Sequence, residues 1–184
     1  GTDPERVVFS GVGKTVAEMD AGLAAGILMF NVESVGELGL LEARALAQGK
    51  PAPVSVRVNP DVDPKTHKYT TTGVKETKFG VDIERAEKVF EQFGKNPAVR
   101  LCALHIHLGS AGHTVQPYIE ALGKTLALVD KLRGKGFTID ALDIGGGYGA
   151  DYVTGQSPTA EDYAAAIVPM LKSKGLKLIL EPGA

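Results

Sequence analysis

Short runs of apolar residues recur along the chain, and the segments between them carry the signals of a helix start. This alternation restricts the fold more than any other feature of the sequence. The runs are rich in valine, isoleucine and leucine, and their shortness is typical of strands buried in a parallel sheet. They cover residues 7–10, 27–32, 54–59, 99–107, 142–145 and 176–181.

Five intervening segments begin at a residue that can cap a helix, and in three of them an acidic residue three positions on completes the spacing of a capping box. The cap candidates, with those partners in parentheses, are Thr15 (Glu18), Ser34 (Glu37), Asp82, Thr114 and Thr159 (Asp162). Strands alternating with helices, without a domain-like linker, predict a β/α architecture. A doubly wound sheet and a (β/α)₈ barrel both fit this pattern. Residues 60–80 lack helical periodicity, which predicts a functional loop.

Composition excludes several classes of protein. The 184 residues suit about one domain, and the formal net charge of −2 argues against binding of nucleic acid or anionic membrane through bulk charge. Cys102 is the single cysteine, so an intrachain disulfide framework and an all-cysteine zinc site are excluded. A reducing compartment is the simplest expectation. No apolar run approaches the roughly 20 residues of a membrane span.

Polar residues gather where the predicted strands end. In a β/α barrel, the carboxyl ends of the strands form the active-site face. Any one of these residues could be an ordinary loop or cap residue, but their coincidence on six strands predicts a site. They are Ser10, Asn31, Ser34, Asn59, residues 107–110, residues 145–147 and residues 181–183.

Two of these strand ends carry recognisable chemistry. Gly145, Gly146 and Gly147 remove every Cβ after a strand, so that backbone N–H groups could approach a phosphate; a plain glycine turn is the alternative. His105 and His107 are two residues apart and therefore share one face of a strand. The pair could bind a divalent metal, or one imidazole could lie against an aromatic cofactor. His105 is also interpretable as a core histidine satisfied by the backbone.

Two charged residues interrupt other apolar runs. Arg57 alternates with valines in its strand, and a buried guanidinium there requires an acidic or anionic partner. Glu181 ends the last apolar run and, if buried, needs a cationic or N–H partner, for which a protonated ring nitrogen would serve. His67 and His113 lie in polar segments and are expected at the surface.

Taken together, the motifs resemble the fold-type III pyridoxal-phosphate decarboxylases, in the order found in that family and over essentially the whole chain. The segment from Asn59 to Gly80, with His67 and Lys78-Phe79-Gly80, favours the diaminopimelate branch over the ornithine and arginine branches. The matching segments are residues 8–11 with Lys14, 30–34, 56–60, 78–80, 105–110, 143–147 and 181–183.

The resemblance implies pyridoxal 5′-phosphate as the cofactor and a role for each matching position. His107 would stack on the cofactor ring, and Glu181 would pair with the ring nitrogen and keep it protonated. Arg57 would help to set the polar floor of the site. The cofactor's phosphate group would be held by Ser110, by Gly145, Gly146 and Gly147, and by the segment Pro182-Gly183 through a backbone N–H of Gly183. No metal ligands are assigned in this interpretation.

The resemblance also implies a partial TIM-type (β/α)₈ barrel over residues 1–184, with about six of the eight βα units, the third to the eighth. The first two strands, with the lysine that forms the Schiff base, and a C-terminal β-domain would lie outside this chain. Lys14 follows the family's third strand and is not expected to be that lysine. Ala184 stands where the family has arginine. The chain alone is therefore expected to be inactive and part of a larger protein.

The activity implied is decarboxylation of a basic or diamino acid in the cytoplasm by a homodimer, with meso-diaminopimelate converted to L-lysine and CO₂. An ornithine-type or arginine-type decarboxylase of the same family is the first alternative. A metal-dependent barrel hydrolase that uses His105 and His107 is the second, and it would need further ligands at other strand ends. A relative that has lost cofactor binding is the third.

Overall fold

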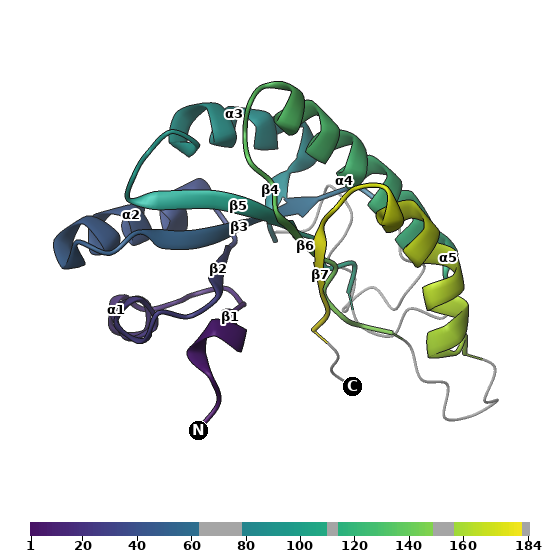
Figure 1. The fold of residues 1–184 in the computed structure, drawn as a ribbon, viewed down its shortest axis with the longest axis horizontal. Coiled ribbons are helices and arrows are strands. Elements are labelled where there is room, and N and C mark those ends of the chain that lie inside the picture. Colours follow the sequence, from purple (N-terminus) through teal and green to yellow (C-terminus); the bar gives the residue numbers. More distant parts are fainter. Residues whose placement is uncertain (63–78, 110–113, 149–156, 182–184) are drawn as a thin grey trace.

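The structure, a computed structural model, describes residues 1–62, 79–109, 114–148 and 157–181. Within these ranges the main strands form one parallel sheet in the order β1-β2-β3-β5-β6-β7. Figure 1 shows the sheet bent into an arc, with α3, α4 and α5 along its outer side. The strands of the path are β1 (Val8–Phe9), β2 (Met29–Val32), β3 (Ala52–Asn59), β5 (Val99–His105), β6 (Ala141–Asp143) and β7 (Lys177–Ile179).

The strand order distinguishes the two architectures that the sequence left open. In a doubly wound sheet the order reverses at a switch point, whereas here each strand of the path lies beside the next one along the chain. This order is that of a barrel wall, and the expected partial TIM-type barrel is confirmed. The short strand β4 (Val81–Asp82), which was not predicted, pairs with the end of β3 and lies off this path.

The helices begin close to the predicted cap residues. Thr15 and Thr159 form complete capping boxes with Glu18 and Asp162. Ser34 accepts a hydrogen bond from the backbone N–H of Glu37, as predicted. The helices are the 3₁₀ turn η1 (Pro4–Arg6), α1 (Val16–Ala25), α2 (Val35–Gln48), α3 (Ile83–Phe93), α4 (Gln116–Gly134) and α5 (Ala160–Lys172). No helix in the described ranges is long and apolar enough to cross a membrane.

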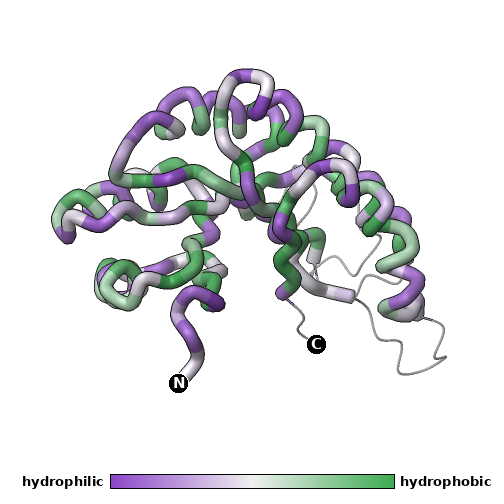
Figure 2. The backbone as a smooth tube through the Cα atoms, viewed as in Figure 1, coloured by the Kyte–Doolittle hydropathy of each residue, from purple (hydrophilic) through white to green (hydrophobic). Residues whose placement is uncertain are grey.

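The two faces of the sheet have different cores. Val54, Val56 and Val58 of β3 belong to the large apolar cluster that joins the sheet to the helices. Hydrophilic and hydrophobic residues alternate along these outer helices, as Figure 2 shows. On the inner face, Met29, Ala103 and Ala141 form a small second cluster near the amino ends of the strands. The carboxyl half of the inner face is left to polar side chains.

Candidate active site

The register of the sheet brings together polar residues that are far apart in the sequence. Arg57 of β3 pairs with His105 of β5, and His105 pairs with Asp143 of β6. His107 and Gly145 each lie two residues beyond the ends of these strands, at the carboxyl end of the row. The register therefore places these described strand ends side by side, and their role as one functional site stays a prediction.

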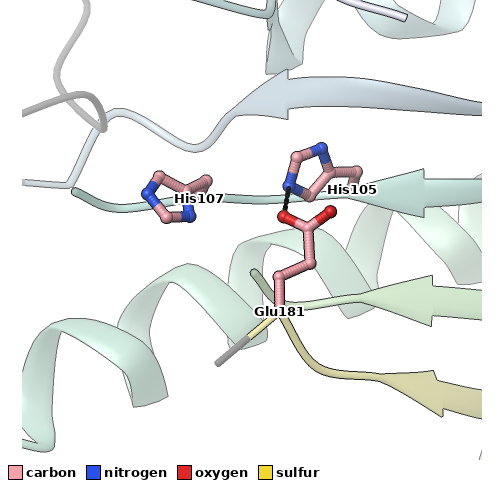
Figure 3. Close-up of side chains that lie close together, drawn as sticks. All are labelled: His105, His107 and Glu181. Carbon is pink, nitrogen blue, oxygen red and sulfur yellow. Dashed lines mark ion pairs between the residues drawn. The ribbon is translucent and has the colours of Figure 1, made fainter. Parts of the chain in front are cut away.

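His105 lies at the bottom of the site and faces Glu181, as Figure 3 shows. Its Nε2 is 3.6 Å from Glu181 Oε2. Burial, followed by the positive charge of Arg57, holds the pKa of His105 well below its usual value, so the ring is neutral at pH 7. The interpretation of His105 as a histidine satisfied by the backbone is wrong. The ring is buried, but neither ring nitrogen has a hydrogen-bond partner in the part of the chain that the structure describes.

His107 lies nearer the mouth of the site and is partly exposed. Its ring is tilted by 54° from the ring of His105, with 6.5 Å between the ring centres. The backbone N–H of Gly146 points at its Nδ1 over 3.4 Å, which makes Nδ1 an acceptor. Burial and the charge of Arg57 lower the pKa of His107, so this ring is also neutral near pH 7.

The glycine turn after β6 requires glycine at its first position. Gly145 has a φ of 65°, and an added Cβ would lie 2.6 Å from His107 Nδ1 and 2.8 Å from the Ile106 carbonyl oxygen. The backbone N–H of Gly145 donates to Asp143 Oδ1 at 2.9 Å. The imidazole of His107 therefore fills the space that a side chain at position 145 would need.

Replacing Gly145 with alanine is expected to lower the free energy of unfolding by more than the roughly 1–3 kcal/mol that a left-handed residue costs, because the clash with His107 is added. Gly136→Ala is the matched control, since Gly136 has a φ of 88° and nothing within 4 Å of its Cβ position. Urea denaturation of both variants measures the difference. Equal losses would show that the contact with His107 imposes no constraint.

Asn31 connects two carboxylates across the inner face, and neither its role nor that of Asp143 was assigned from the sequence. Its Nδ2 donates to Asp143 Oδ2 at 2.8 Å and to Glu181 Oε1 at 3.2 Å. The side-chain oxygen of Asn31 is buried and has no partner among the described residues. The sequence shows that Asn31 and Asp143 interrupt apolar runs, which marks them as candidates for the site. It does not show what Asn31 binds, because Asp143 and Glu181 lie 112 and 150 positions away along the chain.

Burial raises the pKa of Asp143 to about 6, against an ordinary value of 3.8, and the charge of Glu181 adds to this effect. The hydrogen bonds from Asn31 and from the Gly145 N–H oppose it. Asp143 therefore keeps its proton to a higher pH than an ordinary aspartate does.

The raised pKa of Asp143 predicts a specific pH dependence of stability. Between about pH 4 and pH 6, Asp143 holds a proton in the folded protein that it has lost in the unfolded chain. The contribution of Asp143 to the free energy of unfolding therefore falls as pH rises, by at most about 1.4 kcal/mol per pH unit. His105 acts in the opposite direction below pH 6.5, because its pKa is lowered. Wild type and Asp143→Asn share the contribution of His105, so it cancels in the difference between their free energies of unfolding. We expect this difference to be larger at pH 4.5 than at pH 7, and a constant difference would contradict the assignment.

Arg57 has the acidic partner that the sequence required. Its Nη1 donates to both carboxylate oxygens of Glu33 at 2.9 Å, and both side chains are buried. The guanidinium also lies over the ring of Phe79, 5.4 Å from the ring centre. The expectation of an anionic partner is confirmed, and a contact of Arg57 with a cofactor stays a prediction.

Lys14 is fully engaged by groups of the protein. Its Nζ donates to the carbonyl oxygens of Gly11 and Asn31, each at 2.6 Å, and to Glu37 Oε1 at 2.7 Å. These three bonds use all three ammonium hydrogens. The arrangement agrees with the expectation that Lys14 is not the catalytic lysine.

Several predicted positions lie outside the described residues. Ser110, Pro182 and Gly183 are among them, as are His67, His113 and Ala184. Among the described residues, His105, His107 and Glu181 bring one possible metal ligand each within 4.8 Å of one another. Geometry alone would thus allow either a metal ion or an organic cofactor at this site.

Comparison with known proteins favours the organic cofactor. The family model "Pyridoxal-dependent decarboxylase, pyridoxal binding domain" matches residues 1–184. Diaminopimelate decarboxylase of Pseudomonas aeruginosa is 46% identical over 183 residues, and that of Aquifex aeolicus is 45% identical over 184 residues. Both matches cover 100% of this chain but 44% of the relative. The chain thus spans less than half the length of these relatives.

Solved structures agree with the sequence relatives. Diaminopimelate decarboxylase of Helicobacter pylori, complexed with L-lysine, matches with a TM-score of 0.94 and 39% identity, over 98% of this chain and 46% of that one. The arginine decarboxylase of Paramecium bursaria Chlorella virus matches with a TM-score of 0.79 at 22% identity, over 98% of this chain and 46% of that one, and this match supports the fold alone.

Proposed function

Since the chain belongs to the pyridoxal-dependent decarboxylases, through their pyridoxal-binding domain, we propose that it is the cofactor-binding part of a diaminopimelate decarboxylase. The reaction proposed is the conversion of meso-diaminopimelate to L-lysine and CO₂. The observation that carries the proposal is the placement of His107, the glycine turn and Glu181 at the carboxyl ends of β5, β6 and β7, which are neighbours in the sheet.

The described residues fit the two ends of pyridoxal 5′-phosphate. A turn without Cβ atoms suits the phosphate, and a carboxylate suits a protonated ring nitrogen. When bound, the cofactor supplies an electron-withdrawing ring for the electrons left by the departing carboxylate. We propose that His107 lies against the ring and that Gly145, Gly146 and Gly147 hold the phosphate, and the same proposal covers Ser110, Pro182 and Gly183.

Glu181 is proposed to hold the proton on the ring nitrogen. Its carboxylate is oriented from two sides, since Oε1 accepts from the Asn31 amide at 3.2 Å and Oε2 faces His105 Nε2 at 3.6 Å. The backbone N–H of Glu181 donates to the Gly145 carbonyl oxygen at 2.9 Å, which fixes its distance from the glycine turn. A hydrogen bond therefore links Glu181, proposed to pair with the ring nitrogen, to the glycine turn, proposed to hold the phosphate.

The substrate proposal has a separate basis. The relatives that match at 40–46% identity are named diaminopimelate decarboxylases, whereas the arginine and lysine decarboxylases match at 21–22%. This ranking favours the diaminopimelate branch over the arginine branch. A homodimer in the cytoplasm belongs to the same proposal, and sedimentation of the intact protein tests the dimer.

A metal ion is the competing occupant of the site, because neutral His105 and His107 and the carboxylate of Glu181 form a possible set of three ligands. The same side chains cannot serve both groups at once. Metal bound at this position would displace the cofactor ring.

The function is tested by measuring the CO₂ released from meso-diaminopimelate, ornithine and arginine, with and without added pyridoxal 5′-phosphate. The protein assayed is the intact protein, meaning the full-length protein to which this chain is proposed to belong. We expect release from meso-diaminopimelate that depends on the cofactor, and no stoichiometric metal by elemental analysis. Preference for ornithine or arginine would reassign the substrate. Stoichiometric metal without cofactor-dependent release would overturn the proposal.

A further inference from the structure

Both carbonyl groups inside the glycine turn are held by groups of the protein. The Gly145 oxygen accepts from the backbone N–H of Glu181 at 2.9 Å. The Gly146 oxygen accepts from the hydroxyl of Tyr118 at 3.0 Å. The first bond comes from the neighbouring strand end, but the second comes from a side chain in the first turn of α4, in the outer layer.

The bond to Tyr118 decides which way one N–H of the turn points. The carbonyl of Gly146 and the N–H of Gly147 belong to the same trans peptide and therefore point in opposite directions. With the carbonyl held toward Tyr118 on α4, the N–H of Gly147 points away from Tyr118. Glycines on both sides of a peptide allow it to rotate easily, and the rotated peptide would present its carbonyl oxygen to an anion instead.

Tyr118 is itself firmly placed. Its side chain is 3% exposed. Its ring stacks on Tyr148 at 5.3 Å and 19°, and it meets the edge of Tyr163 at 5.3 Å and 82°. Burial raises the pKa of the Tyr118 hydroxyl far above its ordinary value, so the group stays protonated and can only donate to a carbonyl.

We infer that Tyr118 is a positioning residue that acts through its hydroxyl on the glycine turn and presents the Gly147 N–H to the phosphate group of the cofactor. The inference rests on the proposed function, because it takes pyridoxal 5′-phosphate as the ligand. It assigns a role to a residue of the outer helix layer that touches neither cofactor nor substrate.

The test compares two ligands and three forms of the intact protein. Dissociation constants of pyridoxal 5′-phosphate and of pyridoxal, which lacks the phosphate, are measured for wild type, Tyr118→Phe and Thr125→Val. Thr125 is a matched control, since it is a fully buried residue of α4 whose hydroxyl donates to the Ala121 carbonyl oxygen at 2.7 Å, within the helix.

We expect Tyr118→Phe to weaken binding of pyridoxal 5′-phosphate by about three- to tenfold, the effect of one hydrogen bond, and to leave pyridoxal binding unchanged. Thr125→Val should change neither constant. The ratio of the two constants is measured on one protein, so any inactive fraction cancels and a general loss of folding cannot imitate the result.

The outcomes separate the inference from the proposed function. Equal weakening for both ligands, no weakening for either, or a selective loss also in Thr125→Val would overturn the role of Tyr118. Wild-type protein that fails to bind pyridoxal 5′-phosphate would instead overturn the proposed function, and the role of Tyr118 with it.

Discussion

Replacing Arg57 with methionine should lower the free energy of unfolding by about 3–5 kcal/mol. The side chains of Arg57 and Glu33 are only 9% and 6% exposed, and their two hydrogen bonds are both 2.9 Å long. Methionine keeps much of the volume of the arginine stem but leaves the Glu33 carboxylate buried without a counterion. The cost of an unpaired buried charge exceeds the net value of the pair itself.

Two further variants make this prediction specific, with urea denaturation as the measurement. The double variant Arg57→Met/Glu33→Leu removes both charges and should recover most of the lost stability, because the two residues act as a coupled pair. Arg44→Met breaks the ion pair between Arg44 and Asp20, in which the two side chains are 34% and 30% exposed. This substitution should lower the free energy of unfolding much less than Arg57→Met does. A double variant as unstable as Arg57→Met would mean that the arginine stabilises the fold through packing.

The proposed role of Glu181 predicts that, in the full-length protein loaded with cofactor, Glu181→Gln lowers kcat for the proposed decarboxylation on the order of a hundredfold, the usual cost of removing one preorganised electrostatic group. Glutamine can occupy the same place beside Asn31 and His105, but it carries no charge to balance a protonated ring nitrogen. The ring nitrogen would then lose its proton, and the ring would withdraw electrons less strongly. Steady-state kinetics at saturating cofactor measure the effect.

Asp140→Asn is the control for this substitution. Asp140 precedes β6 at the opposite end of the sheet, its side chain is 61% exposed, and it lies 3.7 Å from Arg100. Removing this charge should leave kcat unchanged. If Glu181→Gln also retained wild-type kcat while cofactor was bound, Glu181 would not be the partner of the ring nitrogen.

Local signals in the sequence predicted the elements but not all of their contacts. The capping box predicted at Ser34 forms only in part, because the Glu37 carboxylate accepts from the Glu33 N–H at 2.9 Å and pairs with Lys14 at 2.7 Å instead of returning to Ser34. The strand β4 has two residues and too little apolar character to be recognised. In both places a tertiary contact outweighs a preference that the local sequence can express.

His105 illustrates the same limit inside the site. Its place on the inner face follows from alternation along its strand, which the sequence displays. Neither of its ring nitrogens has a hydrogen-bond partner among the described residues. Its Nε2 lies 3.6 Å from Glu181, a residue 76 positions further along the chain by the residue numbers of the pair. No local pattern encodes such a distance.

The sequence by itself determined the alternation of strands and helices, the identity of the side chains at the carboxyl ends of the strands and the need of Arg57 for an acidic partner. These follow from hydrophobic periodicity, capping and the cost of burying a charge, which act over a few residues or on a single side chain. Only the tertiary structure decided that Glu33 is that partner, that Asn31 joins Asp143 to Glu181, and that Tyr118 holds the Gly146 carbonyl. The register of the parallel strands and the packing of α4 bring these groups together, and both depend on contacts between residues distant in the chain.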